Sequence, residues 1–234
     1  MDKMSLVFDL DNTLTDYDYT NRYAISKVFN EIGRTMKEED FKTFKEFESK
    51  YWKQFEDSSQ ELDTHGMDRI DYVRSKIYQD YFGKDLIPLE CGYHLMNVYI
   101  SNLGVINKVY DGVEDVLDYL YEYYNLFIAS NGPQESQIRK LTNTNLIKYF
   151  KGIVSSEITG YSKPKQEFFD YMIKDFNINP IESGFIGDSL TSDILGAKRN
   201  NMCAIWYNRL NETNTTNIKP DVEIKDMKEL KRIL

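Results

Sequence analysis

The chain has 234 residues, of which 41% are hydrophobic and 29% are charged, a balance typical of a soluble globular protein with one large domain or two modest ones. Its formal charge of −9 argues against a general nucleic-acid binder or membrane-surface binder, because both need an extended basic face. A small anionic substrate is compatible with this charge, since it needs only a local positive site.

Nothing in the sequence indicates a disulfide framework, a membrane span or a secretory signal. Cys91 and Cys203 lie far apart and are expected to be small buried residues rather than disulfide partners or metal ligands. No window approaches the ~18 apolar residues of a membrane span. Asp9 interrupts the first apolar run, which argues against a signal sequence. We therefore expect a cytoplasmic protein without a membrane partner.

The first expected element is a short buried strand that leads into two acids. In the stretch "LVFDLDNTLTD", three apolar residues precede Asp9, and Asp11 follows two positions later. This spacing puts both side chains on the same side of an extended chain. Burying one unpaired carboxylate is costly and two adjacent carboxylates repel each other, so we expect a cation between them.

The next segment, residues 17–107, has a helical pattern. Aromatic residues such as Phe41, Phe44 and Phe47 recur at helical intervals, and strand-like alternation is hard to find. Such a stripe is typical of helices that pack into a core. We expect four or five helices here, inserted as a bundle after the first strand. His65 and His94 fall in this insert and are expected to be structural or exposed rather than catalytic.

From Val109 onward, helices and strands alternate. The expected strands are 125–130, 151–157, 183–188 and 202–208, and the expected helices are 112–124, 134–146, 164–176, 191–201 and 227–234. Near-continuous apolar strands that alternate with helices predict a parallel sheet covered on both faces. The fold class is therefore α/β, with a Rossmann-like core made of residues 1–16 and 108–234 and a helical insert over residues 17–107.

Every expected strand end of the core carries a polar or charged residue, and parallel strands bring their carboxyl ends to one edge of a sheet. These residues are Asp9, Asp11, Ser130, Asn131, Gly132, Lys163, Asp188 and Asp193. Carboxylates suit Mg²⁺, which proteins hold through one or two acids together with substrate phosphate. The lysine, the hydroxyl and the main-chain amides after the second strand would supply donors to a phosphate.

The same residues resemble the motifs of the haloacid dehalogenase (HAD) superfamily of phosphatases, over essentially the whole chain. The stretch "FDLDNTLTD" is similar to its first motif, Ser130 to its second, Lys163 to its third and "GDSLTSD" to its fourth. The helical insert directly after the first motif is similar to the family's C1 cap. The run "GDSLTSDILGAKRNNMCAIWYN" most resembles bacterial nucleotidases that act on pyrimidine and non-standard nucleoside monophosphates.

The resemblance implies a Mg²⁺-dependent phosphomonoesterase that hydrolyses nucleoside 5'-monophosphates through an aspartyl-phosphate intermediate. Asp9 would be the nucleophile, and Asp11 the general acid and base. The Asp9 carboxylate, the Asp11 main-chain carbonyl and the Asp188 carboxylate would hold the metal, while Asp193 would orient metal-bound water or the lysine. The residues expected to bind the transferring phosphoryl group are Ser130, Asn131, Gly132 and Lys163.

Several alternatives stay open at this point. Close relatives within the superfamily hydrolyse sugar phosphates and phosphoglycolate, and a phosphomutase would use the same residues. A 2-haloacid dehalogenase also uses an aspartate nucleophile, but its first motif normally lacks a second acid, so Asp11 argues against it. A signalling receiver domain would need an aspartate on the third strand, where "GIVSSE" has none. The complete acid, hydroxyl and lysine set argues against a non-catalytic interaction protein. The expected partner is a small phosphate ester bound by a monomer or homodimer.

Overall fold

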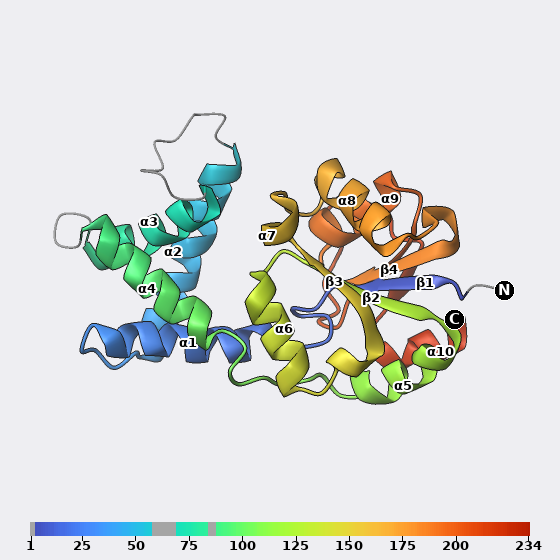
Figure 1. Ribbon diagram of the computed structural model, residues 1–234, viewed down its shortest axis with the longest axis horizontal. Coiled ribbons are helices and arrows are strands. Elements are labelled where there is room, and N and C mark those ends of the chain that lie inside the picture. Colours follow the sequence, from blue (N-terminus) through green and yellow to red (C-terminus); the bar gives the residue numbers. More distant parts are fainter. Residues whose placement is uncertain (1–2, 58–68, 84–87) are drawn as a thin grey trace. The chain divides into compact units, whose positions relative to one another are not determined.

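The computed structural model describes residues 3–57, 69–83 and 88–234, and the chain divides into two compact units (Figure 1). One unit contains the chain up to Tyr17 and from Ile106 onward, and it combines a sheet with helices. The other contains Asp18–Val105, and its described elements are all helices. We call them the α/β unit and the helical unit.

The α/β unit is built on a six-stranded parallel sheet with the strand order β3-β2-β1-β4-β5-β6. The strands are β1 (Ser5–Phe8), β2 (Asn125–Ser130), β3 (Phe150–Ser155), β4 (Ser183–Gly187), β5 (Cys203–Tyr207) and β6 (Val222–Ile224). The first five correspond to the predicted strands. The sequence analysis missed β6, because its two apolar residues lie among charged neighbours and form no apolar run.

Helices connect the strands and cover the sheet. They are α5 (Val113–Tyr123), α6 (Gln134–Asn143), α7 (Ser156–Thr159), α8 (Gln166–Phe176), α9 (Leu195–Arg199) and α10 (Leu230–Ile233), with short turns η1 (Ile147–Tyr149), η2 (Pro180–Glu182), η3 (Leu190–Ile194) and η4 (Met227–Glu229). The segment predicted as one helix over residues 191–201 is divided into the π-helical turn η3 and the short helix α9. The predicted last helix begins with the 3₁₀ turn η4, which a capping box between Asp226 and Glu229 starts.

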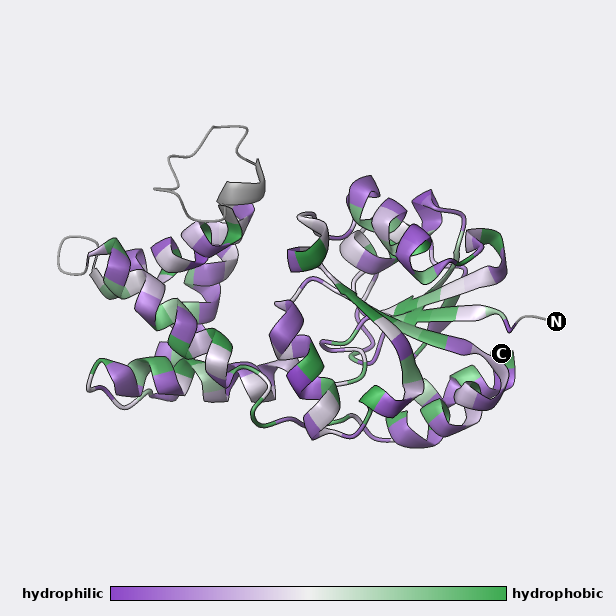
Figure 2. Cartoon of the chain, in the orientation of Figure 1, coloured by the Kyte–Doolittle hydropathy of each residue, from purple (hydrophilic) through white to green (hydrophobic). Residues whose placement is uncertain are grey.

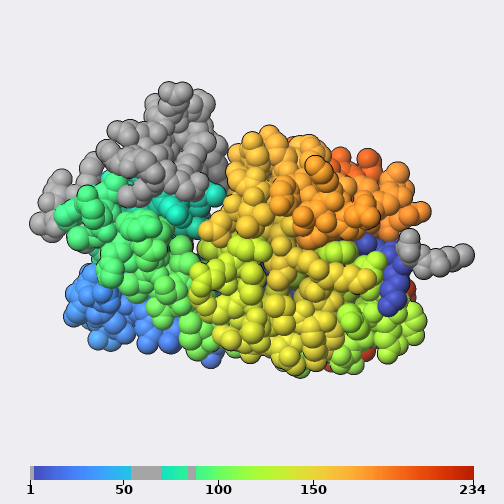
Figure 3. All heavy atoms as spheres, in the orientation of Figure 1, coloured from blue at the N-terminus to red at the C-terminus, as the bar shows by residue number. Residues whose placement is uncertain are grey.

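The two faces of the sheet carry separate hydrophobic cores, because successive side chains of a strand point to opposite faces. Leu6 and Phe8 of β1 pack into the core that contains α5 and α10, whereas Val7 packs into the core that contains α8. Figure 2 shows the central strands as largely hydrophobic segments. In the space-filling view, atoms from α6 through α9 and from β3 make up most of the visible surface of the α/β unit (Figure 3). The buried residues of α8 are Phe168, Phe169, Met172 and Phe176, which recur at helical spacing.

Strand register explains why distant residues meet at one edge of the sheet. Phe8, the last residue of β1, is opposite Ile128 of β2 and Ile186 of β4. Residues just beyond these positions therefore lie at one level of the sheet, at its carboxyl edge. The Asp9 main-chain N–H extends the pairing by donating to the Ile186 carbonyl at 2.9 Å. This edge lies where the strand order reverses around β1, which is the usual ligand position in such sheets.

The helical unit contains, among its described residues, the helices α1 (Tyr17–Glu31), α2 (Glu38–Asp57), α3 (Arg69–Gly83) and α4 (Leu89–Asn102), the first of which begins at the boundary of the two units. The aromatic stripe predicted as core is confirmed for Phe41 and Phe44, which are buried. The Phe44 ring stacks on that of Tyr78, with 5.4 Å between the ring centres. The stripe therefore joins α2 to α3.

The prediction that both cysteines are buried is wrong, since both are exposed free thiols. Cys91 lies in the first turn of α4, and Cys203 is the first residue of β5. His94 is exposed, with its Nε2 2.7 Å from Glu31 Oε1, and His65 lies outside the described residues. In the part of the chain that the structure describes, no helix has both the length and the hydropathy that crossing a membrane requires.

Candidate active site

A cavity of about 370 Å³ opens at the carboxyl edge of the sheet, and the structure brings all eight predicted site residues to its wall. They are Asp9, Asp11, Ser130, Asn131, Gly132, Lys163, Asp188 and Asp193. Ser130 is the last residue of β2, and the others come from the segments that follow β1, β2, β3 and β4. The wall also contains residues that the sequence analysis missed, which are Asn12, Tyr17, Ser189 and Ser192.

The loop after β1 is a tight turn that presents Asp9 to the cavity. The Leu14 N–H donates to the Leu10 carbonyl at 2.9 Å, and Asn12 adopts a left-handed backbone conformation with φ 65°. The turn buries Thr13 completely, and its hydroxyl donates to Asp9 Oδ2 at 3.1 Å. This threonine was not predicted, and the available signal was a hydroxyl four residues after the first acid.

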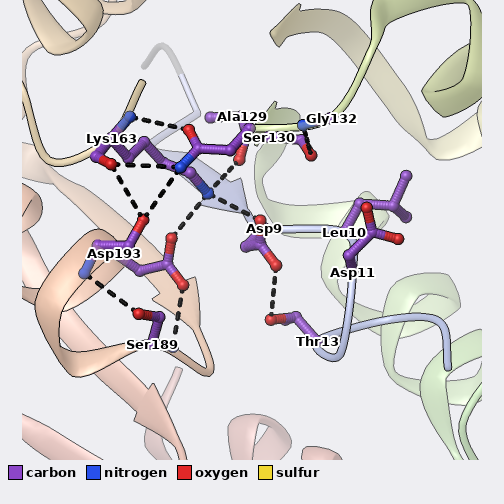
Figure 4. A network of polar contacts seen from close by, with 12 residues as sticks. Asp9, Leu10, Asp11, Thr13, Ala129, Ser130, Gly132, Lys163, Ser189 and Asp193 are labelled. Carbon is purple, nitrogen blue, oxygen red and sulfur yellow. Dashed lines mark hydrogen bonds and ion pairs between the residues drawn. The ribbon is translucent and has the colours of Figure 1, made fainter. Parts of the chain in front are cut away.

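Lys163 is the cation of the site (Figure 4). Its Nζ donates to Asp9 Oδ1 and to the Ala129 carbonyl, each at 2.7 Å, and it lies 2.7 Å from Asp193 Oδ1. Burial lowers the pKa of this lysine, but the Asp193 and Asp9 carboxylates raise it by more, so the pKa is raised overall. The ammonium group is therefore charged at neutral pH.

The backbone of Lys163 is held by the side chain of Asn131. The Lys163 N–H donates to Asn131 Oδ1 at 2.8 Å, and Asn131 Nδ2 donates to the Lys163 carbonyl at 3.2 Å. The peptide bond between Lys163 and Pro164 is cis. The side chain of Asn131 thus ties the loop after β2 to the loop that carries the lysine.

Ser130 and Gly132 form a compact turn at the end of β2. The Ser130 side chain is buried, and its Oγ accepts the Gly132 N–H at 3.2 Å. A Cβ atom at position 132 would lie 1.7 Å from Gln137 Nε2, so any larger residue there would displace the Gln137 side chain. The predicted phosphate donors after β2 therefore already contact one another, and their role toward a phosphate stays a prediction.

Three carboxylates gather next to the lysine. Oxygen atoms of Asp9, Asp188 and Asp193 lie within 4.8 Å of one another. Burial raises the pKa of Asp9 to about 7, with Asp193 adding to the increase and Lys163 opposing it. Burial also raises the pKa of Asp188 to about 8, with the Asp9 and Asp193 carboxylates adding to the increase. One lysine thus leaves an excess of negative charge, and an all-oxygen cluster of this kind fits a hard divalent cation.

Within this cluster, Asp193 is held by the protein on both oxygens. Its Oδ1 lies 2.7 Å from Lys163 Nζ, and its Oδ2 accepts the Ser189 N–H at 3.1 Å. The carboxylate packs against Gly187, where a Cβ atom would lie 2.3 Å from Asp193 Oδ2. These contacts suit the predicted role of Asp193 in orienting the lysine, while its distance to the other two acids also allows it to reach a metal.

Asp11 has different partners from Asp9. Lys140 Nζ donates to Asp11 Oδ1 at 2.5 Å, and Gln137 Nε2 donates to Asp11 Oδ2 at 2.9 Å. Figure 4 shows the Asp11 carboxylate turned away from the cluster around Lys163. The sequence analysis missed Gln137 and Lys140; their spacing of three residues on one helix was the available signal.

The family described as "Haloacid dehalogenase-like hydrolase" matches residues 6–207 of the chain. The HAD-hydrolase YfnB from Bacillus subtilis, in a crystal structure described as bound to magnesium, is similar to this structure with a TM-score of 0.84 and 27% sequence identity, covering 100% of this chain and 99% of that one. The pyrimidine 5'-nucleotidase PynA of Streptococcus pneumoniae is 29% identical over 96% of this chain and 92% of its own length.

A glyceraldehyde 3-phosphate phosphatase of Pyrococcus furiosus is 25% identical over 86% of this chain and 79% of its own length. The matched region contains all eight cavity residues predicted from the sequence. The chain also has a parallel sheet, and it divides into two compact units. The chain therefore belongs to the haloacid dehalogenase-like hydrolase family.

Proposed function

We propose that this hydrolase is a Mg²⁺-dependent phosphomonoesterase whose nucleophile is Asp9. The observation that carries the proposal is the position of the Asp9 carboxylate, which faces the cavity while Lys163 holds one of its oxygens and Thr13 the other. Lys163 and Thr13 together fix the direction of the carboxylate, and the Lys163 ammonium group would also attract a phosphate. A nucleophile held in this way is pre-oriented for in-line attack.

The reaction would proceed in two substitutions. An Asp9 oxygen forms a bond to phosphorus, the bond from phosphorus to the leaving oxygen breaks, and Asp11 gives a proton to the departing alkoxide. Asp11 then accepts a proton from the water that attacks the aspartyl phosphate. The bond between phosphorus and the Asp9 oxygen breaks, which restores the Asp9 carboxylate and releases inorganic phosphate. Lys163 stabilises the negative charge on the phosphoryl oxygens throughout.

A divalent metal fits this chemistry. The proposed ligands are the carboxylates of Asp9 and Asp188 and the main-chain carbonyl of Asp11. Asp193, whose carboxylate lies close to the other two, would orient metal-bound water or Lys163. When bound, Mg²⁺ would offset the repulsion between the anionic nucleophile and the phosphate dianion. At 4 Å and an effective dielectric constant near 20, each such unit-charge repulsion is about 4 kcal/mol.

The proposed substrate is a nucleoside 5'-monophosphate. The similarity to the pyrimidine 5'-nucleotidase over nearly the whole chain supports it. The second candidate is a sugar phosphate, which the similarity to the glyceraldehyde 3-phosphate phosphatase favours. The helical unit would act as the cap that reads the leaving group. The cytoplasmic location and the monomeric or homodimeric state stay predictions.

The test is phosphate release from a panel of nucleoside monophosphates and small sugar phosphates, each with Mg²⁺ and with EDTA. We expect activity that depends on Mg²⁺ and is highest on nucleotides. Equal rates on all substrates would remove the nucleotide preference, and undiminished rates in EDTA would contradict the metal requirement. A parallel assay for glucose 6-phosphate formed from glucose 1-phosphate separates a phosphomutase from a phosphatase.

A further inference from the structure

Lys140 is a completely buried lysine outside the cavity wall. It lies in the last turn of α6, its side chain is 0% exposed, and its Nζ is 2.5 Å from Asp11 Oδ1. Lysine is almost never fully buried unless it is paired, because removing an ammonium group from water costs several kcal/mol. The pairing with Asp11 offsets this cost, which links a buried charge on α6 to one acid of the site.

Gln137 holds the other oxygen of the same carboxylate. It lies one turn before Lys140 on α6, is also completely buried, and donates from Nε2 to Asp11 Oδ2 at 2.9 Å. The reverse orientation of the amide would bring its oxygen against the carboxylate, so the contact fixes the orientation. Among the described residues, Gln137 Oε1 is buried without a hydrogen-bond donor. Leaving a buried acceptor unpaired is unfavourable, so this side chain makes its contact with Asp11 at the expense of stability.

The residues around Gln137 and Lys140 leave space for both side chains. Gly132 leaves the space for Gln137, since a Cβ atom there would lie 1.7 Å from Nε2. The ring of Tyr17, which lines the cavity, lies over Lys140 Nζ with 5.3 Å to the ring centre. Lys140 and Gln137 therefore lie behind the wall, and each donates a hydrogen bond to the Asp11 carboxylate, which lines the cavity.

We infer that Lys140 and Gln137 are positioning residues that hold the Asp11 carboxylate in the cavity for proton transfer to the leaving group. The inference rests on the proposed role of Asp11 as general acid and base. The two acids of the β1 loop thus have separate supports, with Lys163 and Thr13 for the nucleophile and α6 for the proton carrier. A proton donor must lie within hydrogen-bond reach of the leaving oxygen, so loosening it weakens proton transfer selectively.

The test compares leaving groups, because a poor alkoxide leaving group needs the proton and a nitrophenolate does not. The wild-type enzyme and the variants Asp11→Asn, Lys140→Met and Gln137→Leu are assayed with p-nitrophenyl phosphate, phenyl phosphate and an alkyl phosphate, all with Mg²⁺. The quantity compared is kcat/KM, which covers the steps up to departure of the leaving group and leaves out the later hydrolysis of the aspartyl phosphate. We expect Lys140→Met to lower kcat/KM on the alkyl phosphate by roughly 10- to 100-fold and on p-nitrophenyl phosphate by less than about threefold.

Two comparisons make the result specific. The double variant Lys140→Met with Asp11→Asn should depend on the leaving group no more steeply than the single variant Asp11→Asn. The reason is that the lysine acts through the acid, so its loss has no further effect once the acid is gone. Arg139→Met is the matched control, since Arg139 neighbours Lys140 on α6 but pairs with Glu135, and it should keep the wild-type dependence. If Lys140→Met does not fold, Gln137→Leu carries the same expectation.

The outcomes separate the two levels of the proposal. A uniform loss of kcat/KM on all three substrates in Lys140→Met and Gln137→Leu, or an unchanged leaving-group dependence of kcat/KM in both, overturns the positioning role and leaves the phosphatase mechanism intact. An unchanged dependence in Asp11→Asn overturns the proton-transfer role of Asp11 and the inference with it. A steeper dependence in Asp11→Asn and, to a smaller extent, in the α6 variants supports both.

Discussion

Lys163 Nζ lies 2.7 Å from Asp9 Oδ1, although 154 residues separate the two in the chain. Both side chains are almost fully buried, so water screens their interaction little. The contact joins the first strand of the sheet to the loop that follows α7, and it places a fixed positive charge beside the proposed nucleophile.

Asp9→Asn should abolish turnover while the protein stays folded. The amide cannot form the aspartyl phosphate, so we expect kcat to fall by roughly 10⁴-fold or more on every substrate. Phosphate release and near-UV circular dichroism are the measurements. Turnover within tenfold of wild type, after exclusion of deamidation by mass spectrometry, would show that another group attacks phosphorus.

Lys163→Met should destabilise the protein strongly and abolish turnover. The substitution leaves Asp9 and Asp193 buried without their shared cation, and removing one partner of a buried pair costs about 3–5 kcal/mol. Urea unfolding measures the change in the free energy of unfolding. Lys165→Met is the matched control, because Lys165 is exposed on the same loop and should change stability by less than about 0.5 kcal/mol. Equal stability of the two variants would refute the argument.

Thr13→Val should slow turnover by about tenfold and lower the free energy of unfolding by about 1–3 kcal/mol, because Asp9 Oδ2 loses a buried donor. Thr15→Val is the control from the same loop. Thr15 is equally buried, but its hydroxyl donates to the Leu10 carbonyl at 3.4 Å instead of to a site residue. A larger loss of turnover in Thr15→Val than in Thr13→Val would contradict the proposed support of the nucleophile.

The strand-end residues were predictable from the sequence because parallel strands share one direction. Short apolar runs that stop at a polar residue locate the carboxyl ends, and the sheet then gathers Asp9, Ser130 and Asp188 without further information. Lys163 was predicted as part of the loop after β3, but its burial was not, because α7 lies between the strand end and the lysine. This prediction needs only the positions of the hydrophobic runs in the sequence and the residues at which they end.

The supports behind the wall were not predictable in this way. Gln137 and Lys140 lie in a helix with an ordinary polar composition, and only the packing of α6 against the β1 loop shows that they are buried. Thr13 was hidden within a turn whose conformation the sequence did not specify. The strand β6 was missed because pairing with β5, rather than its own apolar content, makes it a strand.

Without divalent metal, stability should fall as the pH rises through the neutral range. The folded-state pKa values of Asp9 and Asp188 are about 7 and about 8, above the ordinary value of 3.8. Between these limits the folded protein binds more protons than the unfolded chain, so the free energy of unfolding decreases with increasing pH. The contribution is complete below about pH 4 and is lost through about pH 7 to 8. Urea unfolding in EDTA at several pH values measures it.

The raised pKa values of Asp9 and Asp188 also make metal binding depend on pH. Mg²⁺ must displace the protons that Asp9 and Asp188 hold, so the rise in Tm on adding Mg²⁺ should be larger near pH 8.5 than near pH 6. Asp188→Asn removes one of these protons and should flatten the pH dependence of stability in EDTA. An equal rise in Tm at both pH values would show that these acids are not the metal ligands.

Gly187→Ala should impair the site without any change in its charged groups. A Cβ atom at this position would lie 2.3 Å from Asp193 Oδ2 and 2.5 Å from Asp193 Cγ, so the carboxylate must move and its contact with Lys163 is disturbed. We expect a loss of about 1–3 kcal/mol in the free energy of unfolding and a clear fall in kcat.

Gly184→Ala on the same strand is the matched control for this substitution. The nearest atom to its new methyl group would be Leu6 Cδ2 at 3.0 Å, at the end of a flexible side chain, and the next would be at 3.8 Å. It should therefore reduce stability moderately and leave kcat close to wild type, because no site residue has to move. If both alanine variants keep the wild-type kcat, the position of the Asp193 carboxylate does not matter for turnover, and its role in orienting Lys163 is wrong.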